Sequence, residues 1–326
     1  MKKRLINLLF ITLICFSAFY FYRVEISSPS IQETQNFTVP KGSNLKETAY
    51  NLKRRNIIPS ILLFKVHAYL TGNQNKIKTG PYLLKKGSSP SDILKLLVLG
   101  KTKLIKITIP EGKNLYEIAK ILEIKKIVNA KKFIEEAKQI KYLDFYSHPI
   151  PNIEGHLFPE TYYLTEKMPE KQVINLFINE YKKRIKSLNW NNSKLNPYEV
   201  LILASIVEKE TGLAQERKRI AGVFTNRLKK RMKIQSDPTT IYGIFENFDG
   251  NLRKKDLRTP TPYNTYTLKR LPIGPISNPG LAAIKAVLEP ENHSFLFFVS
   301  KNDGSHTFSK TYTEHRKKVY RFQIKR

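Results

Sequence analysis

Two glutamates at the end of an apolar run are the residues of this sequence best suited to acid–base chemistry. The run LASIVEKETG, residues 203–212, passes from aliphatic side chains to Glu208 and Glu210 within one helical turn. A glutamate held against apolar walls keeps its proton closer to neutral pH, as a general acid requires. The two acids project about 200° apart on a helix, so one can face a cleft while the other reaches water. Periodicity does not choose between them, and two solvated glutamates ending a helix are the alternative.

Neutral hydrogen-bonding groups and aromatic rings are concentrated in two downstream segments, residues 234–243 and 259–280, which we expect to be loops. Sugar hydroxyls bond to such amide, carboxyl and hydroxyl groups, and sugar rings pack on tyrosine, so the composition suits a carbohydrate. Glu154, in the aromatic segment NIEGHLFPETYYL, is a further candidate for the substrate cleft. The expected binding residues of the two loops are Gln235, Asp237, Thr239, Tyr242, Tyr263, Asn264, Thr265 and Tyr266.

Other kinds of catalytic machinery are missing from the sequence. There is no Gly-x-Ser-x-Gly elbow, no phosphate-binding Walker motif and no His-Glu-x-x-His pair. The six histidines show no close metal-ligand spacing, and Cys15 is the single cysteine. We therefore predict no metal and no cofactor, and expect packing or surface roles for His156 and His306.

The N-terminus predicts a membrane anchor. Basic residues at 2–4 precede an uncharged run from Leu5 to Tyr22, near the lower limit for crossing a bilayer of roughly 30 Å. The leading positive charge predicts a cytoplasmic tail, residues 1–4, with everything after Arg23 outside the cell (inner) membrane. A cleaved signal peptide is the competing interpretation, but SAFYFYRVE offers no small-x-small cleavage site. We expect an uncleaved, single-pass anchor.

The charge balance narrows the partners. Lys and Arg number 57 against 27 Asp and Glu, a formal net charge of +30. Such an excess favours a polyanion or reflects lysines spread over a solvated surface. The lysines are scattered, and a domain outside the membrane rarely meets nucleic acid, so we predict no nucleic-acid partner. An electrostatic tether to anionic lipid or a teichoic-type polymer is a weaker alternative.

The chain after the predicted anchor contains an internal repeat. After a polar stalk, residues 23–36, TVPKGSNLKETA at 38–49 and TIPEGKNLYEIA at 108–119 match at seven of twelve positions. Each copy reads as a strand, a Pro-x-Gly turn and a capped helix. This pattern resembles the peptidoglycan-binding LysM module, and a generic α+β spacer is the alternative. We expect a LysM-like membrane-proximal region over residues 37–150.

A larger catalytic domain is expected over residues 151–326. Asn196 and Pro197 predict the start of a buried helix over 197–211. We also expect an amphipathic helix over 214–232, a helix over 281–290 and a strand over 294–300. Helices and strands alternate without a βαβ rhythm, so the predicted class is α+β.

The ordered series LASIVEKETG, ERKRIAGVFTNRL, QSDPTTIYG and TPYNTYTLKRLPIGPISNPG, with EGHLFPETYYL upstream, closely resembles the endolytic murein transglycosylase family. The resemblance implies cleavage inside peptidoglycan glycan strands near the membrane, without a cofactor. It implies that Glu208 is catalytic, with Glu210 as the reserve candidate. It does not assign roles to the expected binding residues, and the location also allows contact with cell-wall synthesis proteins.

The mechanism implied by the resemblance needs one acid. Glu208 would protonate the glycosidic oxygen between N-acetylmuramic acid and N-acetylglucosamine, then accept the proton of the muramic C6 hydroxyl as a 1,6-anhydro end forms. Ordinary glycosidases pair two carboxylates, so a hydrolytic muramidase using Asp237 or Glu154 as the second acid is one alternative. A non-catalytic peptidoglycan-binding scaffold is the other.

Overall fold

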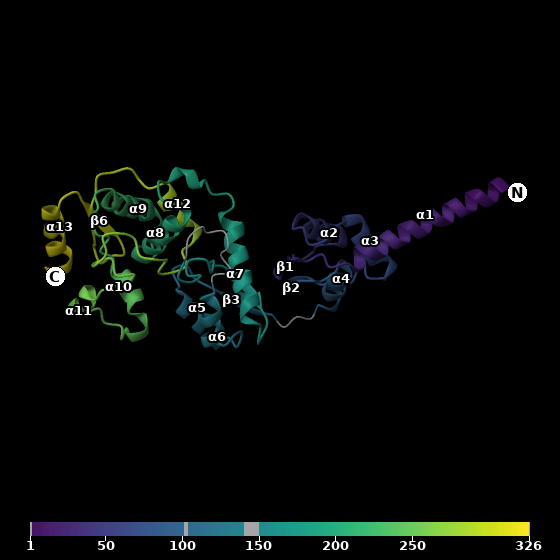
Figure 1. The fold of residues 1–326 in the computed structure, drawn as a ribbon, viewed down its shortest axis with the longest axis horizontal. Helices are drawn as coiled ribbons and strands as arrows, with labels where there is room; N and C mark the ends of the chain where they lie inside the picture. The colour runs from purple at the N-terminus through teal and green to yellow at the C-terminus, as the bar shows by residue number, and fades with distance from the viewer. Residues whose placement is uncertain (1, 101–103, 140–149, 326) are drawn as a thin grey trace. The chain divides into compact units, whose positions relative to one another are not determined.

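The computed structural model describes residues 2–100, 104–139 and 150–325 (Figure 1). Helices are mixed with two-stranded sheets, which confirms the predicted α+β class. The chain divides into two compact units. Unit 1 holds Met1–Ile107 and Tyr162–Glu166, and unit 2 holds Thr108–Thr161 and Lys167–Arg326. The expected boundary at residue 150 falls inside unit 2, because the turn and helices of the second repeat copy are part of that unit.

Unit 1 begins with one long apolar helix. α1 spans Lys2–Ser27, and its window Phe10–Ser27 is long and apolar enough to cross a membrane, with 6% of the window buried. The predicted stalk is shorter than expected, because α1 continues to Ser27 and the first strand begins at Gln35. The other elements of unit 1 are β1 (Gln35–Val39), α2 (Leu45–Arg54), α3 (Ile61–Leu70), β2 (Gly80–Leu84), α4 (Pro90–Leu99) and most of the paired strands β3 (Ile105–Thr108) and β4 (Thr161–Leu164).

The first repeat copy folds around its own small core. β1 and β2 pair antiparallel, with Phe37 opposite Tyr82, and both side chains are buried. α2 starts with a capping box in which Asn44 accepts from the Glu47 amide and Glu47 accepts from the Asn44 amide. Leu52 and Phe64 add fully buried side chains from α2 and α3. The predicted strand, turn and helix after them are confirmed as β2 and α4, whose N-cap is Ser89.

The second repeat copy repeats these devices seventy positions later. α5 (Leu115–Ile124) opens with the capping box of Asn114 and Glu117, and α6 (Ala130–Ala137) takes the place of α3. The helices α2 and α5 also end alike, at left-handed residues Asn56 (φ 55°) and Lys126 (φ 57°). The following amides close the same turn, Ile57 onto Leu52 at 2.9 Å and Ile127 onto Leu122 at 3.0 Å. Each copy thus has the order strand, two helices, strand, helix, which extends the repeat beyond its twelve matched residues.

Unit 2 is built around a buried helix, α8, at its centre. α8 packs against α9 and α12, and every residue from Val200 to Val207 is buried, which confirms the predicted buried helix (Figure 1). The predicted helices over 214–232 and 281–290 and the strand over 294–300 are confirmed with slightly shorter bounds. The elements after α6 are α7 (Glu170–Ile185), η2 (Trp190–Asn192), α8 (Pro197–Glu210), α9 (Ala214–Lys229), α10 (Asp237–Gly243), η3 (Phe245–Asn247), α11 (Lys254–Arg258), α12 (Leu281–Leu288), β5 (Phe297–Ser300), β6 (His306–Ser309), α13 (Tyr312–Val319) and η4 (Tyr320–Ile324).

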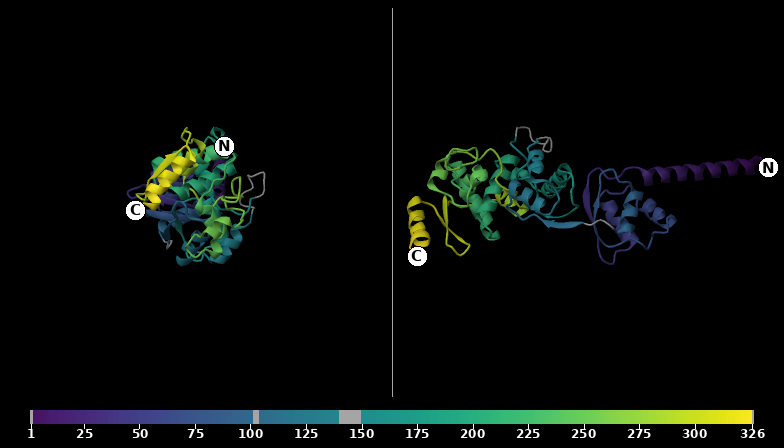
Figure 2. Two further views of the ribbon diagram at one scale, coloured as in Figure 1. Left: turned by 90° about the vertical axis from the view of Figure 1, so that its left-hand side faces the viewer. Right: turned by 90° about the horizontal axis from the view of Figure 1, so that it is seen from below.

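Two further features of unit 2 are a short helix within a predicted loop and a hairpin near the C-terminus. The segment expected to be a loop at 234–243 contains α10, whose first turn includes Pro238 and is closed by the Thr239 hydroxyl donating to the Ser236 carbonyl at 2.6 Å. At the C-terminal end, β5 and β6 form an antiparallel hairpin beside α13, the yellow helix in Figure 2. Polar side chains thus hold the short helix α10, which hydrophobic periodicity does not reveal.

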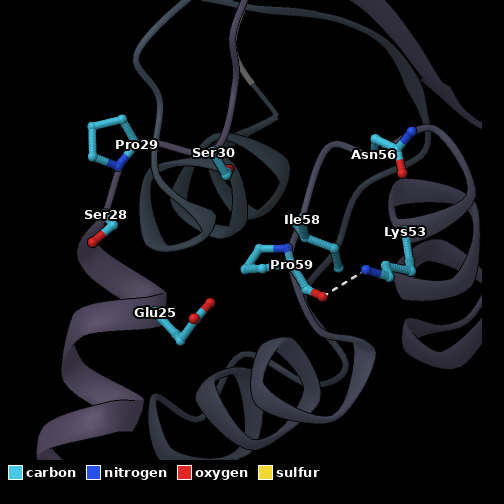
Figure 3. Close-up of a pocket in the computed structure, with 8 residues that line it drawn as sticks. All are labelled: Glu25, Ser28, Pro29, Ser30, Lys53, Asn56, Ile58 and Pro59. Carbon is cyan, nitrogen blue, oxygen red and sulfur yellow. Dashed lines mark hydrogen bonds between the residues drawn. The ribbon is translucent and has the colours of Figure 1, made fainter.

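A pocket of about 290 Å³ lies in unit 1, between the end of α1 and the α2–α3 turn (Figure 3). Its charged lining is one acid, Glu25, and one amine, Lys53, which donates to the Pro59 carbonyl at 2.7 Å. The half-buried Glu25 lies in this pocket without Glu208 or Glu210, so the pocket is not the glycan-cleaving site predicted from the sequence. The candidate acids all lie in unit 2.

Candidate active site

Glu208 ends the buried face of α8 and is held by two donors. Its side chain is only 4% exposed, and its Oε1 lies 3.2 Å from Nη2 of Arg217 on α9. Its Oε2 accepts from the backbone amide of Gly280 at 2.9 Å, and Gly280 is the N-cap of α12. A carboxylate at a helix N-terminus and beside a guanidinium is strongly oriented. Glu208 is therefore not a solvated helix end.

A second carboxyl group lies beside this pair, and the sequence reasoning missed it. Glu111, in the Pro-x-Gly turn of the second repeat copy, places Oε2 3.7 Å from the same Nη2 of Arg217. Burial raises the pKa of Glu111, the Glu208 charge raises it further, and Arg217 opposes both effects. The internal repeat holds the signal that could have identified Glu111. The two copies have the same Pro-x-Gly turn, but the first has Lys41 where the second has Glu111.

Glu210 faces a different set of groups at the same helix end. Its Oε1 accepts from the Ser236 hydroxyl at 2.5 Å. Desolvation of the carboxyl group raises the pKa of Glu210 to about 6; the Ser236 hydrogen bond opposes this, and nearby Asp237 adds to it. Electrostatic interactions with His306 and Arg227 also oppose the shift. A pKa near 6 suits a general acid, so the structure keeps Glu210 as a serious alternative to Glu208.

Some of the predicted sugar-binding residues gather on the Glu210 side. Asp237 is exposed and accepts from the Tyr266 hydroxyl at 2.6 Å. Gln235, also exposed, adopts a left-handed backbone (φ 56°), and its amide donates to the Thr265 carbonyl at 3.3 Å. Burial raises the pKa of Tyr266, and the hydrogen bond to Asp237 raises it further. The Tyr266 hydroxyl therefore stays protonated and donates at neutral pH. Gln235 and Asp237 can therefore meet a ligand from solvent beside the half-buried Tyr266.

Other predicted binding residues are fully buried and hold the loops together. Asn264 and Thr265 have no exposed surface. The Asn264 amide group donates to the Thr259 carbonyl at 2.8 Å, and the Thr265 hydroxyl lies 2.8 Å from that of Thr239. Their polar groups bond within the protein, so here they position Gln235 and Tyr266 instead of facing solvent.

Glu154 is likewise enclosed. It is 0% exposed, and its Oε2 accepts from the Leu115 amide at 2.8 Å and from the Tyr242 hydroxyl at 3.0 Å. Its Oε1 accepts from Nδ2 of Asn278 at 2.6 Å. Burial raises the pKa of Glu154 to about 7, although these hydrogen bonds oppose the shift. The carboxyl group thus joins the start of α5 to α10 and to the loop that leads into α12.

The two histidines expected to pack do so. His156 is fully buried, its Nδ1 lies 3.0 Å from the Glu154 carbonyl, and burial lowers its pKa to about 4. His306, in β6, places Nδ1 2.7 Å from Glu216 of α9, and its backbone amide donates to the same carboxylate at 2.9 Å. The second contact fixes the hairpin against α9 near Glu210.

Comparison with known proteins adds to this geometry. A family model described as the YceG-like family matches residues 37–321, which include both repeat copies, α8 and the downstream loops. The chain belongs to the YceG-like family. A relative from Bacillus subtilis (strain 168), named an endolytic murein transglycosylase, is 32% identical and is aligned over 87% of this chain and 83% of its own length.

Two further YceG-like matches agree. A Streptococcus pneumoniae (strain R6) protein of the same name is 28% identical over 96% of this chain, which spans 63% of that relative's length. A crystal structure of a yceG-like protein from Listeria monocytogenes is similar with a TM-score of 0.59 and 29% identity, over 88% of this chain and 99% of that one. The resemblance stated from the motifs is confirmed at the level of the family.

Proposed function

We propose that this chain is an endolytic murein transglycosylase that cuts within peptidoglycan glycan strands. One observation carries the proposal: a relative of that name matches most of the chain, and the YceG-like family model covers residues 37–321, which contain α8. The acid, the exposed hydroxyl-binding groups and the apolar α1 helix are consistent with a wall-facing enzyme. No cofactor is needed for the reaction.

The proposed chemistry uses Glu208 as proton donor and acceptor. Protonated Glu208 gives its proton to the bridging oxygen as the bond from muramic C1 to that oxygen breaks, which releases the N-acetylglucosamine 4-hydroxyl. The muramic C6 oxygen then bonds to C1, and its hydroxyl proton returns to Glu208. Atoms and charge balance without water, and the product is a 1,6-anhydro-N-acetylmuramic acid end. A solvent-shielded, oriented carboxyl group supports this cycle.

The substrate contacts follow from exposure. Gln235 and Asp237 are exposed and Tyr266 is half-buried, and their polar groups suit sugar hydroxyls, whereas Tyr242, which is 8% exposed, offers little surface. Glu154, Asn264 and Thr265 support the loops from below. We propose that a glycan strand runs along the Glu210 side of the α8 terminus to reach Glu208.

The location is inferred from α1. We propose that α1 is a single-pass anchor with a cytoplasmic N-terminus, so that both repeat copies and α8 lie outside the cell membrane. The two strand–helix–helix–strand copies support LysM-like modules that hold the strand close to the bilayer. This position near nascent wall also allows contact with wall-synthesis proteins.

The experiment compares the two acids directly. Full-length chain in detergent micelles is incubated with purified glycan strands, as wild type, E208Q and E210Q. We expect E208Q to lose cleavage by a factor of about 10² to 10⁴, because the proton donor is removed while the shape is kept. E210Q retains the hydrogen bond with Ser236 and loses far less. The reverse order would transfer the proton-donor role to Glu210, and full activity of both variants would contradict the proposed mechanism.

A further inference from the structure

The turn that carries Glu111 is anchored without its side chain. The amide of Gly112 donates to the Asn278 carbonyl at 2.9 Å, and the Asn278 amide donates to the Lys113 carbonyl at 2.9 Å. Lys209 of α8 adds a bond from Nζ to the Gly112 carbonyl at 3.3 Å. Backbone contacts therefore fix the turn beside the loop into α12, and the carboxyl group of Glu111 is left for another purpose.

That carboxyl group occupies a place kept open by a glycine. A Cβ built on Gly280 would overlap Oε1 of Glu111, so the carboxyl group lies directly on the α carbon of the α12 N-cap. The amide of the same Gly280 donates to Glu208. Arg217, with a side chain 12% exposed, reaches both carboxyl groups through one nitrogen, Nη2. Two acids from distant parts of the chain thus share one cation and one helix N-terminus.

We propose that Glu111 is a positioning residue of the glycan-cleaving site, forming with Glu208, across Arg217, a carboxyl pair that holds the proton used in cleavage. The inference rests on the proposed function and names the partner of its acid. Two neighbouring carboxyl groups ionise together only at a cost, so the pair retains one proton more readily than a lone acid. Arg217 compensates part of the charge and keeps both groups in place.

The charged surroundings agree with this role. Besides Glu208, Arg217 from α9 and the N-terminus of α12 lie against Glu111, and Lys209 from α8 bonds to the carbonyl of the next residue, Gly112. All three favour negative charge, so without a second acid the site would hold its proton poorly. Desolvation of Glu111 acts in the opposite direction and raises the pKa of this carboxyl group. Glu111 supplies the negative charge that offsets the cations.

The test uses E111Q in the full-length chain, with cleavage of purified glycan strands measured against pH. We expect kcat to fall about tenfold at pH 7, with KM unchanged. The alkaline limb of the pH–rate profile should move to lower pH, because the loss of one negative charge lets the remaining acid ionise earlier. E111D, which keeps the charge, should restore much of the wild-type profile.

Two matched variants separate this role from a structural one. G280A keeps the amide bonded to Glu208 but displaces the Glu111 carboxyl group, so its profile should shift like that of E111Q. E117Q removes an equal charge from the same repeat copy, where Glu117 pairs with Lys113 at 2.6 Å, and a glutamine at this position still caps α5. Its profile should match wild type. Thermal unfolding of each variant tests whether the fold is kept.

The outcomes are distinguishable from failure of the proposed function. If wild type releases anhydro ends while E111Q and G280A keep the wild-type rate and profile, the carboxyl pair is overturned and the transglycosylase stands. A loss in E111Q as complete as in E208Q, with the fold intact, would also overturn the positioning role. If wild type cuts no strand, the proposed function fails.

Discussion

The two copies of the repeat share a local fold but differ in what surrounds them. Both have a Pro-x-Gly turn, a capping box and a left-handed residue after the helix. In the first copy the turn carries Lys41, and the helices pack inside unit 1. In the second copy the turn carries Glu111, which reaches the acid at the end of α8. Local sequence signals thus set the module, whereas one side chain and its distant neighbours set the chemistry.

The largest expected effect comes from truncating the matched core leucines. Leu52 and Leu122 are both fully buried, so L52A and L122A should each cost about 2 to 5 kcal/mol of unfolding free energy. Because Leu122 lies in unit 2, only L122A should lower the temperature at which glycan cleavage is lost. Calorimetry and residual cleavage after heating measure the two effects. If L52A and L122A lost cleavage at the same temperature, the two copies would not belong to separate cooperative units.

A second test concerns pH and applies to the second copy. The buried carboxyl group of Glu154, which accepts from the first amide of α5, has its pKa raised from 4.5 to about 7. Its protonated form is favoured by folding, so this stabilisation is fully present below pH 4.5 and is lost as the pH rises through about 7. The contribution is on the order of 3 kcal/mol.

Urea unfolding at pH 5 and pH 8 measures this contribution, with E154Q as the comparison. We expect E154Q to be less stable at both values, because its NH2 group cannot accept from the donors of Leu115 and Tyr242. It should lack the component of the pH dependence that Glu154 supplies. Equal pH dependence in wild type and E154Q would show that Glu154 does not titrate in this range.

The smallest expected effect compares the two left-handed positions. Lysine pays a steric penalty at a positive φ that asparagine largely avoids, so K126G should stabilise the chain by about 0.5 to 1 kcal/mol. N56G should change the stability far less. Chemical unfolding of both variants makes the comparison, and an equal gain at the two positions would contradict the steric explanation.

The sequence predicts elements whose signals are local. Asn196 and Pro197 mark the start of α8, and the apolar residues after them predict its burial. α10 was missed because its seven residues, DPTTIYG, are held by Thr239 and by Thr240, which donates to Asn264 at 2.9 Å, and not by an apolar stripe. The contact between Thr240 and Asn264 joins residues far apart in the chain, which periodicity does not report.

The site was predictable only in part for the same reason. The ending of α8 in two acids is visible in the sequence, whereas the different partners of Glu208 and Glu210 depend on Arg217, Gly280 and Ser236 from other elements. Burial of Glu154 and Asn264 depends on packing as well. Residue type identified groups that suit a sugar, and only the fold separates those that face solvent from those that support them.

We propose a cleavage that needs no water. Glycoside hydrolases pair two carboxylates, and Glu111 lies beside Glu208, so hydrolysis is the alternative to test. The decisive measurement is the mass of the products that the full-length chain releases from purified glycan strands in ¹⁸O-labelled water. We predict 1,6-anhydro ends without ¹⁸O. Reducing ends that carry ¹⁸O would contradict the account and identify a muramidase.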